Sequence, residues 1–281
     1  MDLFSVSTIK SLLARYNAAP LKRLGQNFLI SQKVLQKIIE AATLDRGEAV
    51  LEIGPGLGTL TQELAKKVKK VIAIEKDKKM VEILKETLKD YKNVKIINAD
   101  VLKLRNQEIG KLENYKITAN LPYNIASAVI RKFLEIKNPP KEMILMLQKE
   151  VTQRICAKPP RMSLLAVAIQ FYAEAKIINY VKKGAFWPPP KVDSAIIKIT
   201  PYSDPNIRKH LNDRNIFFKV ARAGFSAPRK QLINNLSKKL KIERQIILSA
   251  VRKAKIKPEQ RAETLNINDW LILTKILEPY L

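Results

Sequence analysis

Short apolar runs alternate with longer amphipathic segments through the first two thirds of the chain. Strands are expected at AVLEI, VIAIE, VKIIN and KITAN, because each short run ends at a polar or glycine-rich turn. Helices are expected between them, for example at TLTQELAKKV and MVEILKETLKDY, where apolar residues recur every three or four positions. Strands that alternate with helices predict an α/β fold with a parallel sheet.

The same alternation continues to about residue 200. SAVIRKFLE predicts a helix, EMILMLQKE a strand that runs into helical VTQRICA, and SAIIKITPY a late strand behind a proline-stiffened loop. TPYSDPN (200–206) is polar and rich in turn residues, so we interpret it as a linker. Helical segments follow it at NIFFKVARAGF, RKQLINNLSKKL, ERQIILSAVRKA and INDWLILTKILEPYL. Two domains are therefore predicted, residues 1–203 with the sheet and residues 204–281 as a small helical domain.

Charge narrows the class of partner. The 281 residues include 52 Lys+Arg and 26 Asp+Glu, a net charge of +26, and residues 204–281 alone hold 17 basic and 7 acidic side chains. A field of this size attracts polyanions, so nucleic acid is the favoured partner and the helical domain a candidate RNA-binding domain. We expect no membrane association, because no apolar run approaches the roughly 20 residues that span a bilayer. One cysteine, Cys156, excludes an internal disulfide and a cysteine-cluster metal site, which favours a reducing cytoplasmic location.

Glycines and acidic residues follow three successive strands. EIGPGLG places Gly54, Gly56 and Gly58 between a strand and a helix, where the backbone turns tightly and a ligand can approach it. Glu75 closes the next strand as a candidate acceptor for ribose hydroxyls, and Asp100 follows the third as a candidate adenine contact. The G-x-G-x-G spacing and the lack of a P-loop favour S-adenosylmethionine over NAD or ATP. The alternatives are a solvated charge for Glu75 and a turn cap for Asp100.

Asn120-Leu121-Pro122-Tyr123 ends the fourth strand. An adenine amine is a poor nucleophile, and two acceptors for its N–H groups would favour a tetrahedral nitrogen with a free lone pair. Asn120 offers a side-chain carbonyl, and a backbone carbonyl freed beside Pro122 offers the second acceptor. Tyr123 can stack on the extruded base, and Phe186 on the proline-stiffened loop is the candidate for its other face.

No strong base is required, because the nitrogen becomes acidic only after it is methylated. His210, the one histidine, is therefore expected to be structural, and no metal is expected. The alternatives are a plain strand-ending turn for the tetrapeptide and a core position for Phe186, with the neighbouring Trp187 pointing the other way.

Nine segments together resemble the ribosomal RNA small-subunit adenine dimethyltransferases. They are LGQNFL (24–29), EIGPGLGTLT (52–61), VIAIEKD (71–77), NAD (98–100), NLPYNI (120–125), LQKEV (147–151), FWPPPKVDSA (186–195), RKQLINNL (229–236) and RAETL (261–265). The resemblance implies a Rossmann-like S-adenosylmethionine-dependent methyltransferase sheet with a small C-terminal α-helical domain. It also implies dimethylation of two adjacent adenines in the 3′-terminal hairpin of small-subunit (16S) rRNA, on a pre-assembled small ribosomal subunit, by a monomer.

Residue roles follow from the same resemblance. Catalytic positions are Asn120, Leu121, Pro122, Tyr123 and Phe186, and cofactor contacts are Gln26, Asn27, Leu29, Gly54, Gly56, Glu75, Asp100 and Asn120. The resemblance does not extend to AKPPRMSLLAV (157–167), which is shorter than in many relatives, so no substrate contact is assigned there. Two alternatives remain, a large-subunit rRNA adenine methyltransferase and a non-catalytic RNA-binding assembly or transcription factor of the same fold.

Overall fold

The computed structural model describes residues 1–104, 112–122, 125–202 and 214–281. Two predicted positions, Tyr123 and His210, lie outside the described residues. The chain divides into two compact units, Met1–Thr152 with Ala175–Pro201, and Gln153–Glu174 with Tyr202–Leu281. The second unit thus takes in a segment from the middle of the chain, and the predicted domain boundary between residues 203 and 204 stays a proposal.

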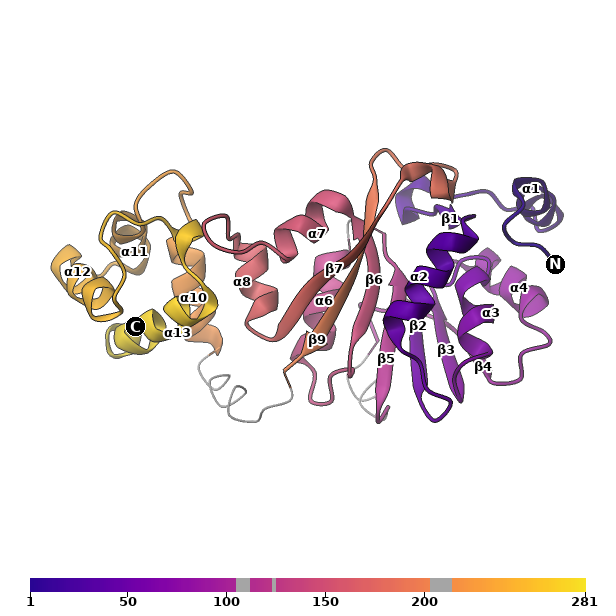
Figure 1. Cartoon of the computed structure of the whole chain (residues 1–281), viewed down its shortest axis with the longest axis horizontal. Helices are drawn as coiled ribbons and strands as arrows, with labels where there is room; N and C mark the ends of the chain where they lie inside the picture. The colour runs from indigo at the N-terminus through magenta and orange to yellow at the C-terminus, as the bar shows by residue number, and fades with distance from the viewer. Residues whose placement is uncertain (105–111, 123–124, 203–213) are drawn as a thin grey trace. The chain divides into compact units, whose positions relative to one another are not determined.

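A seven-stranded sheet with the order β4-β3-β2-β5-β6-β9-β7 forms the centre of the first unit (Figure 1). Its strands are β2 (Ala49–Ile53), β3 (Lys70–Glu75), β4 (Val94–Asn98), β5 (Tyr115–Asn120), β6 (Met143–Gln148), β7 (Ala173–Val181) and β9 (Ser194–Pro201). The five strands from β4 to β6 are parallel and β9 pairs antiparallel with β6. The predicted parallel sheet is confirmed, and the strand β7 is an addition that the apolar pattern did not predict.

The strand order reverses between β2 and β5, which are neighbours although β3 and β4 lie between them in sequence. The side chains of both strands are almost entirely buried, with only Ala49 and Asn120 partly exposed. Near-continuous burial is typical of parallel strands whose two faces are both covered. A gap opens beyond the carboxyl ends of such strands at the reversal, because their connections leave in opposite directions.

Helices of the first unit bury one apolar stripe each. They are α1 (Val6–Arg15), α2 (Gln32–Ala42), α3 (Thr59–Ala65), α4 (Lys78–Thr87) and α6 (Ala126–Glu135). The helix α7 (Lys149–Ile155) follows β6, and the division between the two units falls within it. In α2, the Ser31 hydroxyl accepts a hydrogen bond from Val34 N and caps the helix, and Leu35 and Ile38 are buried. These two side chains pack with Leu64 of α3 and with strand residues in one core cluster.

A small second sheet pairs segments that are far apart in sequence. β1 (Phe28–Leu29) runs antiparallel to β8 (Phe186–Trp187), with Phe28 opposite Trp187 and Leu29 opposite Phe186. The short 3-10 helix η1 (Lys22–Leu24) precedes β1, and η2 (Lys183–Ala185) precedes β8. This pairing fixes the segment LGQNFL beside the loop that follows β7.

The second unit is helical, as predicted. It contains α8 (Leu164–Gln170), α10 (Arg214–Gly224), α11 (Leu232–Leu240), α12 (Arg244–Lys253) and α13 (Ile267–Leu277). Phe171 stacks on Phe217 with ring centroids 4.2 Å apart, which joins the segment after α8 to α10. Trp270 of α13 is fully buried and stacks on Phe225 at 5.5 Å, and it is the largest side chain of this core. The predicted helices at the end of the chain are therefore confirmed.

Replacement of Gly224 by alanine is expected to destabilise the second unit. The added Cβ would lie 2.4 Å from Cη2 of Trp270 and 3.0 Å from Cδ1 of Leu232, and such overpacking costs about 1–3 kcal/mol. Urea unfolding followed by tryptophan fluorescence measures the loss. Gly184→Ala is the control, because nothing lies within 4 Å of its added Cβ; equal stability of both variants would contradict the packing argument.

Candidate active site

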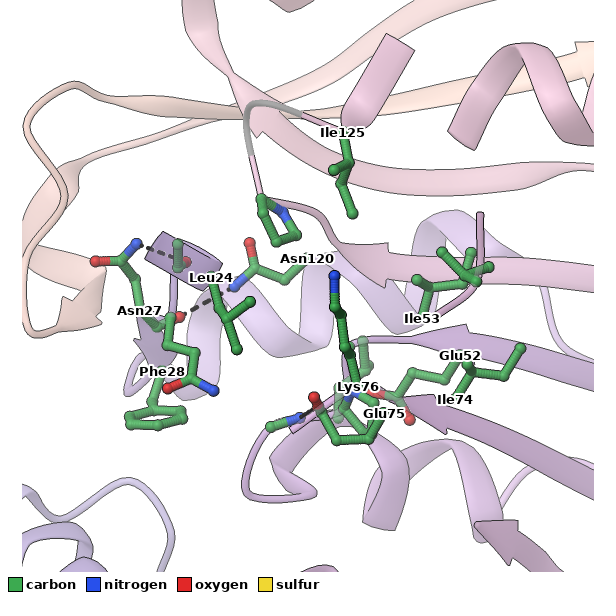
Figure 2. A pocket seen from close by; sticks show the side chains of 18 of the residues that line it. Leu24, Asn27, Phe28, Glu52, Ile53, Ile74, Glu75, Lys76, Asn120 and Ile125 are labelled. Carbon is green, nitrogen blue, oxygen red and sulfur yellow. Dashed lines mark hydrogen bonds between the residues drawn. The ribbon is translucent and has the colours of Figure 1, made fainter. Parts of the chain in front are cut away.

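A cavity of about 250 Å³ opens in the first unit beyond the carboxyl ends of β2, β3 and β5, where the strand order reverses. Its volume is close to the lower end of the ~300–1,000 Å³ range of small-molecule sites. One wall is the segment 23–29, another is the loop 52–57, and the remainder comes from strand ends that include Glu75, Asp100 and Asn120. The predicted site residues from all four strands therefore meet in one cavity (Figure 2).

The glycine loop follows β2 with positive φ angles, a backbone conformation that residues other than glycine rarely adopt. Gly54, Gly56 and Gly58 have φ values of 70°, 60° and 90°. Gly54 N donates to Ile74 O at 2.9 Å, which ties the loop to β3. A Cβ on Gly58 would lie 3.2 Å from side-chain atoms of α4, so the close approach of loop and helix also requires glycine there.

Glu75, at the end of β3, is a buried and hydrogen-bonded carboxylate. It is 6% exposed, and its Oε1 accepts from Asp77 N at 2.8 Å while Oε2 accepts from Gly56 N at 3.3 Å. Burial raises the pKa of Glu75, and the hydrogen bonds from these backbone N–H groups oppose that rise. Glu75 is therefore not the solvated charge that the sequence left as an alternative.

Asp100 lines the cavity and also caps the turn after β4. Its Oδ1 accepts from Leu102 N at 3.0 Å, and its Oδ2 forms an ion pair with Lys76 Nζ at 2.9 Å. The Lys76 ammonium holds the pKa of the Asp100 carboxyl below its usual range. One oxygen of Asp100 thus caps the turn, as the alternative interpretation expected. The contact of Asp100 with an adenine stays a prediction.

Asn120 has a defined orientation at the end of β5. Its Nδ2 donates to the carbonyl oxygen of Asn27 at 3.1 Å, and because a carbonyl can only accept, the amide nitrogen must face Asn27 (Figure 2). Among the described residues, no donor reaches the Asn120 Oδ1. The side-chain carbonyl is therefore left as an acceptor in a residue that lines the cavity.

Leu121 and Pro122 follow Asn120, and only Pro122 lines the cavity. The Leu121 side chain is buried and its N donates to Met146 O at 3.2 Å, which extends the pairing of β5 with β6. Pro122 lines the cavity, and its carbonyl oxygen accepts from Ile125 N at 3.2 Å. No described residue donates to the Leu121 carbonyl oxygen, so this is the backbone acceptor that remains beside Asn120.

The segment LGQNFL forms a wall of the cavity through its own hydrogen bonds. Gln26 Nε2 donates to Asp77 Oδ2 at 2.9 Å, and Gln26 Oε1 accepts from Leu21 N at 2.8 Å. The side-chain Nδ2 of Asn27 donates to Gly25 O at 3.0 Å, and the backbone carbonyl of Asn27 accepts from Asn120 Nδ2 at 3.1 Å. Gln26 and Asn27 therefore position the wall, and their direct contacts with a cofactor stay predictions, as does that of the buried Leu29.

Phe186 lies in the core and is absent from the cavity lining. It is 3% exposed and packs with Leu29, Ile144 and Met146. Trp187 belongs to a different cluster, as expected for successive residues of a strand, and Lys10 Nζ lies 5.8 Å from its ring centroid. In this structure Phe186 is a core residue, which is the alternative that the sequence left open. A role for Phe186 as the partner of Tyr123 in base stacking stays a prediction.

Glu52 is a cavity residue for which the sequence predicted no role. It lies in β2 beside Thr118 of β5, is 2% exposed, and its Oε2 has no hydrogen-bond partner among the described residues. Burial, and to a lesser degree the charge of Glu75, raise the pKa of Glu52 to about 8. The Thr61 hydroxyl lies near enough to oppose this rise, although it has no hydrogen-bond partner among the described residues. A single acid inside the apolar run AVLEI was the signal that could have identified it.

The described residues contain no cluster of three histidine, cysteine, aspartate or glutamate side chains suited to a metal ion. Within the same ranges, every helix is too short or too polar to cross a membrane.

This fold and cavity define a Rossmann-like α/β protein that holds acidic and amide groups at the switch point of its sheet. Residues 20–278 match the family described as ribosomal RNA adenine dimethylase, and the chain belongs to that family of methyltransferases.

Relatives cover almost the whole chain. The chain is 47% identical over 262 residues to the ribosomal RNA small subunit methyltransferase A of Dehalococcoides mccartyi, covering 93% of this chain and 89% of that protein. It is 39% identical over 288 residues to the protein of the same name from Geobacillus thermodenitrificans, covering 99% and 98%.

Two solved structures share the fold. A dimethyladenosine transferase from Plasmodium falciparum has a TM-score of 0.76 and 28% identity, covering 89% of this chain and 97% of that one. The 23S rRNA methyltransferase ErmE has a TM-score of 0.71 and 26% identity, covering 90% and 100%. Both likenesses extend over the sheet and the helical tail.

Replacement of Glu52 by glutamine is expected to stabilise the cofactor-free protein at alkaline pH. The folded-state pKa is about 8, above the ordinary 4.5, so the unfolded chain releases its proton first as pH rises and the free energy of unfolding falls between these values. Glu52→Gln does not undergo this loss, because glutamine has no carboxyl group to titrate. Its stability advantage should grow by on the order of 3 kcal/mol from pH 5 to pH 8.5.

Thermal unfolding of both proteins across this pH range measures the effect. Glu40→Gln, an exposed position, removes the same charge and should show no comparable trend. A constant difference between Glu52→Gln and the unmodified protein would contradict the raised pKa.

Proposed function

We propose that the protein transfers methyl groups from S-adenosylmethionine to the N6 amines of two adjacent adenines in the 3′-terminal hairpin of small-subunit rRNA. The observation that carries this proposal is the orientation of Asn120. Its amide nitrogen is held by the Asn27 carbonyl at 3.1 Å, and its Oδ1 is left without a donor from the described residues. A preorganised acceptor of this kind suits an amine whose nitrogen must become tetrahedral.

The cavity fits a cofactor that combines adenosine with positive charge. Glu52 Oε2 is buried without a hydrogen-bond partner among the described residues, and a cationic ligand would remove that unfavourable burial. Glu75 and Asp100 supply carboxylates at neighbouring strand ends, as a ribose and an adenine amine require. When bound, S-adenosylmethionine supplies a methyl group on a sulfonium. Asn120 and the Leu121 carbonyl would hold the acceptor amine at the same cavity.

Two carbonyl oxygens are proposed to reshape the target amine. Asn120 Oδ1 and the Leu121 carbonyl would each accept one N–H bond of the adenine N6, so the lone pair is directed at the methyl group. Neither is an acid or a base, and none is needed until the nitrogen carries the new methyl group. Tyr123 is proposed to stack on the flipped base, and Phe186 could join it only by leaving the core position that it occupies here.

Small-subunit rRNA is favoured over large-subunit rRNA as the substrate. Relatives named small subunit methyltransferase A are 39–47% identical to this chain, whereas ErmE, named for 23S rRNA, is 26% identical. The segments PPPKVDSA, RKQLINNL and RAETL support the same choice. A net charge of +26 suits a folded RNA within a partly assembled subunit, and we propose that a cytoplasmic monomer acts on it through the basic helical domain.

Mapping of methylated adenines tests the reaction and its substrate together. The purified protein with S-adenosylmethionine should form N6,N6-dimethyladenine at two adjacent positions of small-subunit rRNA and leave large-subunit rRNA unmodified. Asn120→Ala should lower kcat by about 10²–10³-fold while RNA affinity is retained, because one preorganised acceptor is lost. Modification confined to large-subunit rRNA would contradict the proposal, and RNA binding with no methylation would favour an assembly factor.

Substitution of Glu75 tests cofactor binding separately from RNA binding. Glu75→Ala removes the acceptor of Gly56 N and Asp77 N and the proposed ribose contact, so methyl transfer should be lost with RNA affinity unchanged. Glu75→Gln retains the size of the side chain and part of its acceptor capacity, and should bind S-adenosylmethionine more weakly in calorimetry without unfolding. Glu82→Ala, on the exposed side of α4, is the control. Unchanged methyl transfer in both Glu75 variants would refute the assignment.

A further inference from the structure

A second hollow lies at the amino ends of the strands β2, β3 and β4, at the opposite end of these strands from the cavity. Four lysines line it, two at the start of β3 and two around the start of β4, and we call it the lysine hollow: Lys69, Lys70, Lys92 and Lys95. All four side chains are exposed. None of their amines makes a hydrogen bond or an ion pair with a described residue.

The acidic residues of the lysine hollow do not neutralise it. Glu48 is bound to two lysines outside the hollow, to Lys116 Nζ at 3.0 Å and to Lys141 Nζ at 3.2 Å. Glu113 is exposed and forms no ion pair with a described residue. The free carboxylate of Glu113 offsets one of the four lysines, so the hollow keeps a net positive charge.

The backbone that carries these lysines is tied down. Asn93 Nδ2 donates to Ala65 O at 2.8 Å and to Val68 O at 3.0 Å, and Asn93 O accepts from Val71 N at 3.0 Å. Lys69 N donates to Glu48 O at 3.0 Å. The positions of the lysine Cα atoms are thus fixed by the fold, and an anionic ligand would have to order only the side chains.

The lysine hollow is too far from the cavity for one small ligand to touch both. β3 begins with Lys70 in the hollow and ends with Glu75 in the cavity, a span of about 17 Å for a strand that rises ~3.3 Å per residue. Four amines around one hollow also exceed what a single phosphate needs. The hollow is therefore a site separate from the cavity, and its four unpaired amines at the starts of β3 and β4 suit a polyanion with successive phosphates.

We propose that the lysine hollow binds the phosphodiester backbone of a second segment of the substrate RNA, away from the methylated hairpin. The inference rests on the proposed function for the identity of that RNA. Such contacts fix the position of the enzyme on a large RNA and carry no sequence information, so they raise affinity without taking part in methyl transfer. The surface would explain why the sheet unit is basic in addition to the helical tail.

The test is the salt dependence of RNA binding. Lys70→Ala/Lys95→Ala should bind small-subunit rRNA about three- to tenfold more weakly at 0.1 M salt, and the slope of log K against log salt should fall by about 1.5, as for two lost phosphate contacts. The control Lys33→Ala/Lys85→Ala removes the same charge from exposed positions on α2 and α4 and should change neither by a comparable amount. Cofactor affinity and kcat should be unchanged, with KM for RNA raised.

The outcomes separate this inference from the proposed function. Equal affinities and slopes for the two double variants would overturn it, whether or not the protein methylates RNA. A methylation-inactive protein whose RNA binding still depends on Lys70 and Lys95 would support the hollow and contradict only the reaction. Inorganic phosphate is the remaining probe. If it raises the melting temperature only when these lysines are present, and RNA affinity does not depend on them, the hollow binds a small anion and the RNA assignment is wrong.

Discussion

Backbone hydrogen bonding of β2 to β3 on one side and to β5 on the other brings three separated strand ends to one edge of the sheet. Every proposed contact at the cavity depends on this parallel pairing. The glycine loop leaves β2, Glu75 closes β3, and Asn120 closes β5. A one-residue slip in either pairing would turn these side chains to the other face and remove the cavity.

The site is built from groups that burial disfavours. Glu52 has no hydrogen-bond partner among the described residues, and the buried Glu75 is held by two backbone N–H groups of the loop and the following turn. A buried carboxyl without a counter-ion raises its own pKa and weakens the fold at alkaline pH, which apolar residues at the same positions would not do. Both acids suit the positively charged ligand that we propose for this cavity.

The two ends of the parallel strands carry different side chains. The carboxyl ends place Glu52, Glu75 and Asp100 around the cavity, with Lys76 paired to Asp100, and the amino ends carry the lysine hollow. Because β3 runs from one to the other, the fold keeps the lysine hollow and the cavity about 17 Å apart. This distance exceeds the Debye length of about 8 Å at physiological ionic strength, so the charge of the lysine hollow is largely screened at the cavity.

The α/β class, the parallel strands, the helical tail and the residues that follow each strand could be predicted from the sequence, because apolar periodicity and strand-ending glycines, acids and Asn120 are local signals. β7 was not predicted, because its pairing depends on a neighbour distant in the chain, and Glu52 received no role. The burial of Phe186 against Leu29, the orientation of the Asn120 amide by Asn27 and the gathering of four lysines around one hollow became visible only in the folded protein. Each of these is a contact between segments far apart in sequence, and local pattern carries no information about which distant partner a side chain meets.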